Sequence, residues 1–368
     1  MVEIPVNPGT LSVILPCYNE KENISFLIEH FEALDSDSTI ARIIFVDDDS
    51  PDGTAEFIKS LPPYKFDLLC LSRVGRQGLS SAVVEGLLLA DTPYVAVMDA
   101  DGQHSPKDLI NMFAFMTSIN ADFVVGSRFL QENHLTNHVG FRGAISKLGN
   151  GVANRILNQH LTDPLTGFFI MRRELMLRVV RKVKPTGFKI LLDFLYHLKD
   201  QKIALHEYPI SFANRHAGES KLDSRNLIEF VEQITGYLTK SLVPEKFLSF
   251  IFVGSIGLLV HLSLLYLFLF YGDLEFLMAQ VLATGVSMVS NFTFNNVLTF
   301  RRNRLTGKYW IKGLLFFMLI CSLGSLANVG VAGYLFSQGK VWWVSGILGV
   351  LVGTVFNFSL SRFYIWKS

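Results

Sequence analysis

The sequence predicts an α/β domain built on a mostly parallel sheet, followed by an all-α membrane domain of four transmembrane helices. Strand-like apolar runs alternate with amphipathic helical segments in the first part of the chain, whereas the last third is almost continuously apolar. Charge divides the chain in the same way. Residues 1–245 hold 24 Lys and Arg against 30 Asp and Glu, and residues 246–368 hold 9 against 2. We therefore expect one part in water and the other in a bilayer.

Strands and helices are expected to alternate through the α/β part. The expected strands are residues 11–15, 43–46, 67–71, 94–98 and 122–126, with helices after Asn19 and over 54–60, 79–90 and 106–118. Pro16 is expected to end the first strand, and Asn19 to cap the helix after it. Because the carboxyl ends of parallel strands share one edge of a sheet, polar residues at those ends should converge there. These residues are Asn19, Glu20, Asp47, Asp48, Arg73, Asp99, Asp101 and Arg128.

The last third contains four apolar stretches that are long enough to cross a bilayer, at 247–271, 276–299, 310–336 and 341–361. Cations crowd the connection after the second stretch, whereas the first connection carries Asp273 and Glu275. The positive-inside rule then places both termini and the middle connection in the cytoplasm, and nothing at the N-terminus resembles a signal peptide. We expect a multi-pass protein of the cell membrane with its α/β domain in the cytoplasm.

Spaced repeats indicate that the membrane domain is a duplicated hairpin. At a spacing of 67, Ser255, Gly257 and His261 recur as Ser322, Gly324 and Asn328, and at a spacing of 66, Asn291-Phe292 recurs as Asn357-Phe358. The polar groups at membrane depth, His261, Asn291 and Asn357, fit either a polar track with lipid contacts or hydrogen bonds between helices, and we favour the hydrogen bonds.

An amphipathic helix is expected over 225–243, lying on the membrane surface. Residues 142–157 fit a second surface helix or an ordinary amphipathic helix equally well. The expected boundaries are 1–224 for the cytoplasmic domain, 225–245 for the surface helix and 246–368 for the transmembrane domain.

Several functional classes are excluded. The α/β part is mildly acidic, which argues against a nucleic-acid partner. No G-x-G-x-x-G follows the first strand, and no P-loop pattern occurs anywhere in the chain. Cys17, Cys70 and Cys321 are too scattered for a disulfide framework or a zinc site.

The segment Val97-Met-Asp-Ala-Asp-Gly-Gln-His104 points to a metal site. It places Asp99 and Asp101 on alternate positions just past a strand, so that both carboxylates can reach one hard divalent cation while Gln103 adds an amide oxygen. Such a cation could bridge the phosphates of a nucleotide-sugar and stabilise the departing diphosphate. A solvated turn is the alternative. We favour the metal, because the pair ends a strand and a second acidic turn lies nearby.

Two further groups are candidates for binding. Asp47 and Asp48 could accept N–H groups from a base ring, or else cap the helix that follows them. Arg215 and Lys221 belong to a basic segment shortly before the membrane, with Gly and Ser residues that suit a closing loop. We favour a diphosphate or a lipid phosphate as the partner of these two cations over general attraction to anionic lipid.

The ordered motifs resemble those of the polyprenyl-phosphate (dolichyl-phosphate) mannose synthases among the inverting GT-A, family 2 glycosyltransferases. The likeness covers nearly all of residues 10–225, and the last four spans resemble the small GtrA-like membrane domain. The motifs are Pro16-Cys-Tyr-Asn-Glu20, Val46-Asp-Asp-Asp-Ser-Pro-Asp-Gly-Thr54, Gly78-Leu-Ser-Ser-Ala82, Met98-Asp-Ala-Asp-Gly-Gln-His104, Gly126-Ser-Arg128, Asp163-Pro-Leu-Thr-Gly-Phe168, Gly187-Phe-Lys-Ile-Leu-Leu192 and Arg215…Gly218-Glu-Ser-Lys-Leu222.

The resemblance implies a GT-A fold with a Rossmann-like sheet, and it implies roles for single residues. Those implied for the nucleotide are Pro16, Tyr18, Glu20, Val46, Asp48, Asp99, Ala100, Asp101, Arg215 and Lys221. Mg²⁺ or Mn²⁺ would be held by Asp99, Asp101 and Gln103, and catalysis is implied for Asp101, Arg128, Arg215 and Lys221. Asp163 could assist as a base or cap its own turn, and we favour the cap. The sequence departs from the family pattern at Gly102, where Leu is usual, and at Ser105, where Pro is usual.

The implied activity is transfer of mannose from GDP-mannose to a polyprenyl (dolichyl-type) phosphate, with inversion, at the cytoplasmic face of the lipid bilayer. UDP-glucose or a UDP-aminosugar is the alternative donor. A processive polysaccharide synthase is disfavoured because no Gln-x-x-Arg-Trp occurs, and a non-enzymatic flippase or scaffold is disfavoured because Asp99 and Asp101 are both present. A homo-oligomer is compatible with the sequence.

Overall fold

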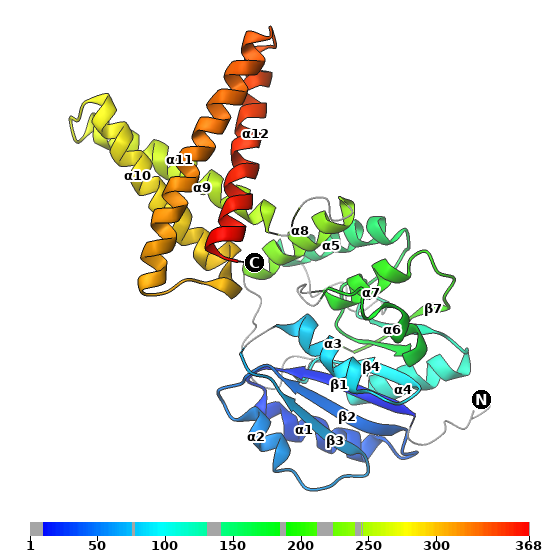
Figure 1. Cartoon of the computed structure of the whole chain (residues 1–368). Coiled ribbons are helices and arrows are strands. Elements are labelled where there is room, and N and C mark those ends of the chain that lie inside the picture. Colours follow the sequence, from blue (N-terminus) through cyan, green and yellow to red (C-terminus); the bar gives the residue numbers. More distant parts are fainter. Residues whose placement is uncertain are drawn as a thin grey trace. The chain divides into compact units, whose positions relative to one another are not determined.

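The chain forms two compact units, Met1–Phe230 and Val231–Ser368, the first holding the sheet and the second four long helices (Figure 1). The computed structural model describes residues 10–75, 78–130, 141–184, 189–211, 224–239, 244 and 246–367. The division between the units falls inside helix α8, Ser224–Leu238. This helix lies within the stretch that the sequence predicts as amphipathic, and residues 240–243 of that stretch are outside the described residues.

Within the described residues, the first unit contains one sheet of seven strands in the order β3-β2-β1-β4-β6-β5-β7. The strands are β1 Leu11–Cys17, β2 Ile40–Asp47, β3 Asp67–Ser72, β4 Tyr94–Val97, β5 Phe123–Ser127, β6 Phe169–Arg172 and β7 Leu205–Pro209. All pairs are parallel except those of β6 with β4 and β5. The predicted mostly parallel sheet is confirmed, and β6 and β7 extend it beyond the five expected strands.

Two local predictions at the end of β1 are wrong. Pro16 lies inside the strand, paired with Val46. The oxygen of Ile14 accepts a hydrogen bond from Met98, and the oxygen of Cys17 accepts one from Asp48. The nitrogen of Pro16 therefore faces β4, beyond the last residue of that strand. Because no strand partner lies there, the lack of an N–H on Pro16 removes no hydrogen bond from the sheet.

Asn19 does not cap the helix after β1. That helix, α1 Lys21–Leu34, has Glu20 at its N-cap position and no capping bond from a side chain. Asn19 instead adopts a left-handed backbone with φ of 55° and donates its N–H to Ser50 Oγ over 2.9 Å. Asn tolerates this conformation better than most residues, so the sharp turn after β1 suits it.

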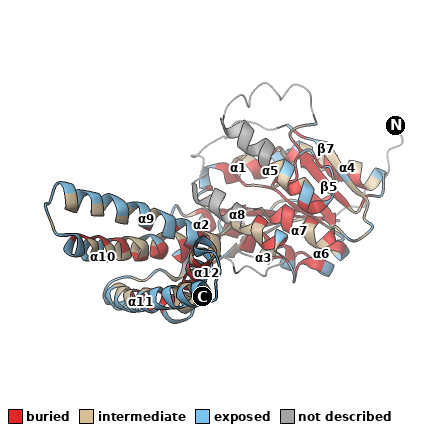
Figure 2. Cartoon of the chain, turned by 90° about the horizontal axis from the view of Figure 1, so that it is seen from above, coloured by how far each residue is buried: buried red, intermediate tan, exposed pale blue. Residues whose placement is uncertain are grey.

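Helices cover both faces of the sheet. Besides α1 they are α2 Thr54–Lys59, α3 Leu79–Leu89, α4 Pro106–Ser118, α5 Phe141–Leu157, α6 Arg173–Val179 and α7 Ile190–Leu198. The apolar faces of α1 and α4 pack with Val13 and Leu15 of β1 in one buried core. On the opposite face α3 approaches so closely that a Cβ on Gly86 would lie 2.6 Å from Ile14. Figure 2 shows the buried residues gathered along the strands and on the helix faces turned to them.

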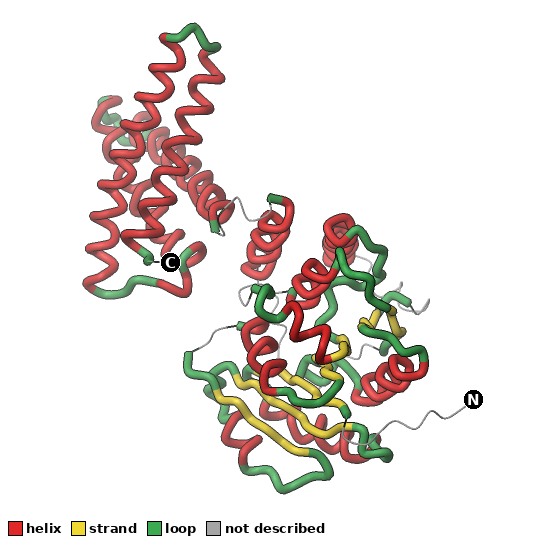
Figure 3. Tube along the Cα trace, turned by 45° about the vertical axis from the view of Figure 1, so that its right-hand side comes forward, coloured by secondary structure: helices red, strands yellow, loops and turns green. Residues whose placement is uncertain are grey.

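The second unit contains four helices long and apolar enough to span a membrane, counted over its described residues. They form two antiparallel hairpins, α9 Phe247–Phe270 with α10 Phe276–Phe294, and α11 Lys308–Ser337 with α12 Trp342–Leu360 (Figure 3). A π-helical turn follows each second helix, Asn295–Thr299 after α10 and Ser361–Ile365 after α12.

The two hairpins repeat the same contacts, which supports the predicted duplication. Phe250 and Phe317 are 67 residues apart and pack against Phe358 and Phe292, with ring centroids 5.4 Å and 5.6 Å apart respectively. Phe300 stacks on Trp366, its equivalent 66 residues later, at 4.2 Å. The same aromatic cluster thus joins the hairpins from both sides.

Among the residues that the structure describes, Asn291 and Asn357, at membrane depth, do not make the expected hydrogen bonds between helices through their side-chain oxygens. A Cβ on Gly257 would lie 2.0 Å from Asn291 Oδ1, and a Cβ on Gly324 would lie 1.9 Å from Asn357 Oδ1. Neither oxygen has a hydrogen-bond partner within the described part of the chain. Each asparagine therefore fills the notch that a glycine leaves on the opposite helix, and close packing replaces the expected interhelical hydrogen bond of this oxygen.

Candidate active site

The described residues of the predicted site lie at or just after the carboxyl ends of parallel strands. Glu20 follows β1, Asp48 follows β2, Asp99 and Asp101 follow β4, and Arg128 follows β5. The sheet order places β1 between β2 and β4, so the first three of these ends are neighbours. Arg215 and Lys221 lie outside the described residues.

The acidic residues at the ends of β1 and β2 are buried and held by hydrogen bonds. Glu20 is buried, donates its N–H to Thr54 Oγ1 over 3.2 Å and accepts from Asn23 Nδ2 over 2.7 Å. Asp47 is also buried and accepts both the N–H and the hydroxyl of Ser50. Its carboxylate therefore shapes the acidic turn. It does not cap the following helix α2, whose N-cap residue is Gly53 and which has no capping bond from a side chain.

Asp48 is held by a buried arginine. Its Oδ1 accepts from Arg73 Nη1 over 2.9 Å, and its Oδ2 accepts from the N–H of Gly78 over 2.9 Å. Arg73 also donates to the oxygen of Gly78, to Ser81 and to Glu85. The Arg73 side chain is 1% exposed and that of Asp48 7%. The sequence marks Arg73 only as a polar residue at a strand end. In the structure it connects β2 to the start of α3 and fixes the orientation of Asp48.

The acidic turn after β4 presents two different carboxylates. Asp101 is buried, and its Oδ1 accepts from the N–H of Gln103 over 3.1 Å, whereas the side chain of Asp99 is 36% exposed. Gly102 has φ of 74°, a conformation that favours glycine over the leucine usual in the family. Ser105 accepts from the N–H of Lys107 and so caps α4. Both departures from the family pattern therefore fit the local backbone.

A second segment packs directly against this acidic turn. A Cβ on Gly167 would lie 3.1 Å from both carboxylate oxygens of Asp99. The neighbouring Phe168 stacks on His104 with centroids 4.7 Å apart. Burial lowers the pKa of His104 to about 4, so that this ring is neutral at physiological pH and its Nδ1 lies 3.9 Å from Asp99 Oδ2.

Two cations lie beside the acids. Arg128 donates from Nε and Nη2 to the fully buried carboxylate of Asp163, over 2.7 Å and 3.0 Å. Burial lowers the pKa of Arg128, but the hydrogen bonds and the charge of Asp163 outweigh that effect and leave it raised. The sequence favours Asp163 as a cap of its own turn. Its carboxylate pairs with Arg128 instead.

Lys189 is a site residue to which the sequence gives no role. It directly precedes α7 and donates from Nζ to the oxygen of Leu165 over 3.0 Å. Burial first, and then the charge of Arg128, lower the pKa of Lys189 to about 8, while the negative charges of Asp99 and Asp163 raise it. The sequence signal for Lys189 is its place in the Gly187–Leu192 motif. The spacing of residues within this motif does not show that Lys189 lies near Asp99, Arg128 and Asp163.

The donor set fits a hard divalent cation. Two carboxylates, Asp99 and Asp101, and the amide of Gln103 belong to one turn, and oxygen ligands of this kind suit Mg²⁺ or Mn²⁺. Within the described residues no three His, Cys, Asp or Glu side chains are grouped to hold a metal. An ion here would therefore need the Gln103 oxygen, water or substrate phosphate to complete its shell.

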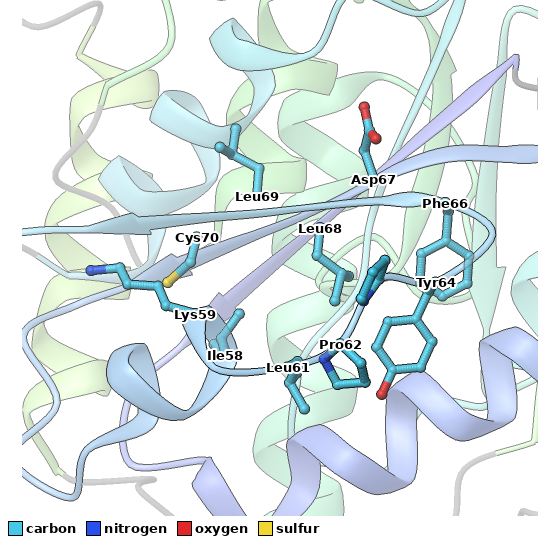
Figure 4. A pocket seen from close by; sticks show the side chains of 11 residues that line it. Ile58, Lys59, Leu61, Pro62, Tyr64, Phe66, Asp67, Leu68, Leu69 and Cys70 are labelled. Atoms are coloured by element: carbon cyan, nitrogen blue, oxygen red, sulfur yellow. The ribbon is translucent and has the colours of Figure 1, made fainter.

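A pocket of about 540 Å³ lies apart from these residues, between α2, β3 and the segment that joins them. Figure 4 shows Leu61, Pro62 and Tyr64 of that segment beside Leu68 of β3. None of the predicted site residues lines it. The strand ends, and not this hollow, are the candidate active site.

Comparisons with known proteins show which family the chain belongs to. Residues 12–179 match the family model described as glycosyl transferase family 2, and residues 249–366 match the GtrA/DPMS transmembrane domain. The chain is 31% identical to a dolichol-phosphate mannosyltransferase of Pyrococcus furiosus over 363 residues, which cover 97% of this chain and 99% of that protein. It is 32% identical to the Saccharomyces cerevisiae dolichol-phosphate mannosyltransferase over 230 residues, 61% of this chain and 85% of that one.

Solved structures similar to the chain include mannosyl-3-phosphoglycerate synthase from Rubrobacter xylanophilus, at 22% identity and a TM-score of 0.47, covering 63% of this chain and 74% of that one. The likeness along nearly the whole length of the archaeal relative confirms the family that the ordered motifs indicate. This chain is a glycosyltransferase of family 2 and belongs, with its GtrA/DPMS transmembrane domain, to the family of the dolichol-phosphate mannosyltransferases.

Proposed function

We propose that the protein transfers mannose from GDP-mannose to a polyprenyl (dolichyl-type) phosphate, with inversion, at the cytoplasmic face of the membrane. The single observation that carries this proposal is the meeting of acids and cations at one edge of the sheet. Burial acts to lower the pKa of both Arg128 and Lys189, and at both cations the negative charge of Asp99 acts in the opposite direction, so all three groups lie at one site. A site of this kind can hold a metal-bound diphosphate on one side and a phosphate nucleophile on the other.

On the donor side, Asp99, Asp101 and Gln103 would hold Mg²⁺ or Mn²⁺. The ion, when bound, screens the diphosphate and lowers the cost of its departure. Pro16, Tyr18, Glu20 and Asp48, at the ends of β1 and β2, would line the nucleoside pocket, and Val46 and Ala100 would also contact the nucleotide. Arg73 supports this pocket indirectly, because it fixes the carboxylate of Asp48.

The acceptor needs little help from a base. A lipid phosphate has a second pKa near ~6 and is largely dianionic at neutral pH. Its oxygen can attack the anomeric carbon from the face opposite the leaving diphosphate, which inverts the configuration. Asp163 is fully buried and paired with Arg128 through both carboxylate oxygens. We therefore assign it no role as a base, and the protein acts by positioning and by neutralising charge.

Cations complete the phosphate side. Arg128 and Lys189 are the described candidates, and Arg215 and Lys221 keep the phosphate-binding role expected from the sequence. In the membrane unit, Lys340 and both acids, Asp273 and Glu275, lie in the connections after α9 and α11. The other cations lie between α10 and α11, in the first turns of α11, or at the two ends of this unit. This unequal distribution of cations supports the proposal that the connection between α10 and α11 and both ends of the membrane unit face the cytoplasm.

The test is transfer by the purified full-length protein in vesicles that contain a polyprenyl phosphate. GDP-mannose, UDP-glucose and UDP-GlcNAc are supplied in parallel, and the lipid-linked sugar is measured. We expect product with GDP-mannose. Preferential use of UDP-glucose or UDP-GlcNAc would favour the alternative donor.

A matched pair of arginines tests the site itself. Arg128→Ala should reduce transfer by roughly 100-fold, since it removes a partly buried charge at the reacting phosphate. Arg178→Ala is the control, because Arg178 is 56% exposed on α6 and pairs with the exposed Glu174 one turn away. Equal activity of the two variants would remove Arg128 from the mechanism.

A further inference from the structure

The turn that carries Asp163 is fixed by a carboxylate from a distant strand. Glu207 of β7 accepts the N–H of Thr162 at Oε1 over 2.8 Å and at Oε2 over 2.9 Å. Its Oε1 also accepts the hydroxyl of Thr162 over 2.9 Å and the N–H of Asp163 over 3.1 Å. The same hydroxyl lies 2.5 Å from the hydroxyl of Ser127, at the end of β5.

These contacts lead straight to the guanidinium of Arg128. Asp163 receives Nε and Nη2 of Arg128 side by side, a bidentate arrangement that fixes the plane of the guanidinium as well as its position. The carboxylate of Asp163 is fully buried, so it has no room to follow a displaced partner. The place of Arg128 therefore depends on the place of the Asp163 backbone, which Glu207 holds.

Strand pairing alone does not require this arrangement. β7 already pairs in parallel with β5 through the backbone, from Phe123 with Leu205 to Ser127 with Pro209. The four bonds of Glu207 instead go to a turn 44 or 45 residues earlier in the chain.

We propose that Glu207 is a positioning residue for the transfer reaction, holding the Thr162–Asp163 turn so that Arg128 presents its guanidinium to the acceptor phosphate. This inference rests on the proposed function, because it takes the phosphate as the partner of Arg128. It goes beyond it by giving β7, which carries none of the motifs that define the site, a part in binding the acceptor.

Three substitutions at two positions separate positioning from folding. Glu207→Ala should raise the KM for polyprenyl phosphate or lower kcat by about tenfold or more, since small displacements of a positioned group have large kinetic effects. Glu207→Gln keeps an oxygen for the three bonds that Oε1 accepts, and should lose less than about threefold. Glu174→Ala removes an exposed carboxylate of α6 and should change nothing.

A double-mutant cycle with Arg128 decides the matter. If Glu207 acts through Arg128, Glu207→Ala should cost less than about twofold in transfer when Arg128 is already Ala, although it costs about tenfold in the wild type. GDP affinity in the presence of Mg²⁺, measured by calorimetry, should stay the same in all variants. The same tenfold loss in both backgrounds, or a parallel loss of GDP affinity, would show that Glu207 only supports the fold.

Failure of the proposed function would be recognised separately, as a wild-type protein that makes no lipid-linked sugar from any donor. In that case the affinity of the same variants for geranyl phosphate, measured by calorimetry, gives the cycle without turnover. Coupling between Glu207 and Arg128 in this affinity would uphold the positioning role. Independent effects, or none, would overturn it.

Discussion

Replacing Arg73 with methionine tests how strongly the nucleotide side of the site depends on one buried ion pair. Arg73 and Asp48 are joined over 2.9 Å, and their side chains are 1% and 7% exposed. Methionine fills similar space but leaves the carboxylate of Asp48 buried without the positive charge of the guanidinium, while the Gly78 N–H still donates to it. Removing one partner of such a pair costs about 3–5 kcal/mol.

The expected change is large enough to measure in the full-length protein. For a unit of this size, about 3 kcal/mol corresponds to a fall in melting temperature of roughly 10 °C. Thermal unfolding in detergent, followed by circular dichroism, gives this number, and calorimetry with GDP and Mg²⁺ gives the nucleotide affinity. We expect both to fall in Arg73→Met. Adding Asp48→Asn should restore part of the stability, because it removes the uncompensated charge, but should not restore nucleotide binding.

An unchanged melting temperature in Arg73→Met would refute the reasoning, since it would mean that Asp48 does not need its partner. Normal GDP affinity in a destabilised variant would refute a different step. It would show that the ion pair supports the fold while Asp48 does not serve the nucleotide.

Three further predictions follow from the structure. Asp101→Asn should lower transfer roughly 100-fold or more with the fold intact, and excess chelator should stop the wild type, because the diphosphate would face bare carboxylates; undiminished transfer in chelator excludes the metal. Transfer should fall as pH rises through about 8, because Lys189 loses its proton and its charge there. In Lys189→Arg this fall in activity should move to higher pH. Identical pH profiles of kcat/KM for the wild type and Lys189→Arg would contradict this role of Lys189. Gly257→Ala should destabilise the α9–α10 hairpin by about 1–3 kcal/mol in thermal melts, because the new Cβ would lie 2.0 Å from Asn291 Oδ1. Gly330→Ala is the control and should be neutral, because its Cβ would meet no atom within 4 Å. Equal melting temperatures of the two variants would disprove the close packing at Gly257.

The strands that the sequence predicts are those whose signal is local. β1 and β5 are buried along their whole length, and β2 is buried from Ile43 to Asp47, so that each contains an apolar run. β6 has only four residues and ends in Arg172, and β7 has no buried residue. Their places depend on pairing with strands far away in the sequence, which no window of a few residues records.

The site shows the same limit. Asp99 and Asp101 could be found because the two residues that act together are neighbours in the chain. The pairing of Arg128 with Asp163 crosses 35 residues, and that of Arg73 with Asp48 crosses 25. Lys189 reaches the site only because its segment folds against the turn that contains Leu165. Residue type and spacing indicate the chemistry of a site, but partners contributed by separate segments become visible only in the fold.

The most direct measurement is the identity and anomeric configuration of the lipid product, determined by mass spectrometry and NMR after incubation of the full-length protein with GDP-mannose and a polyprenyl phosphate. GDP-mannose carries an α-linked sugar, so attack by the lipid phosphate from the opposite face should give a β-mannosyl phosphate. The product should be absent with Asp101→Asn. An α-linked product would contradict single-step inversion, and a wild-type protein that forms no mannosyl lipid under these conditions would contradict the proposed reaction.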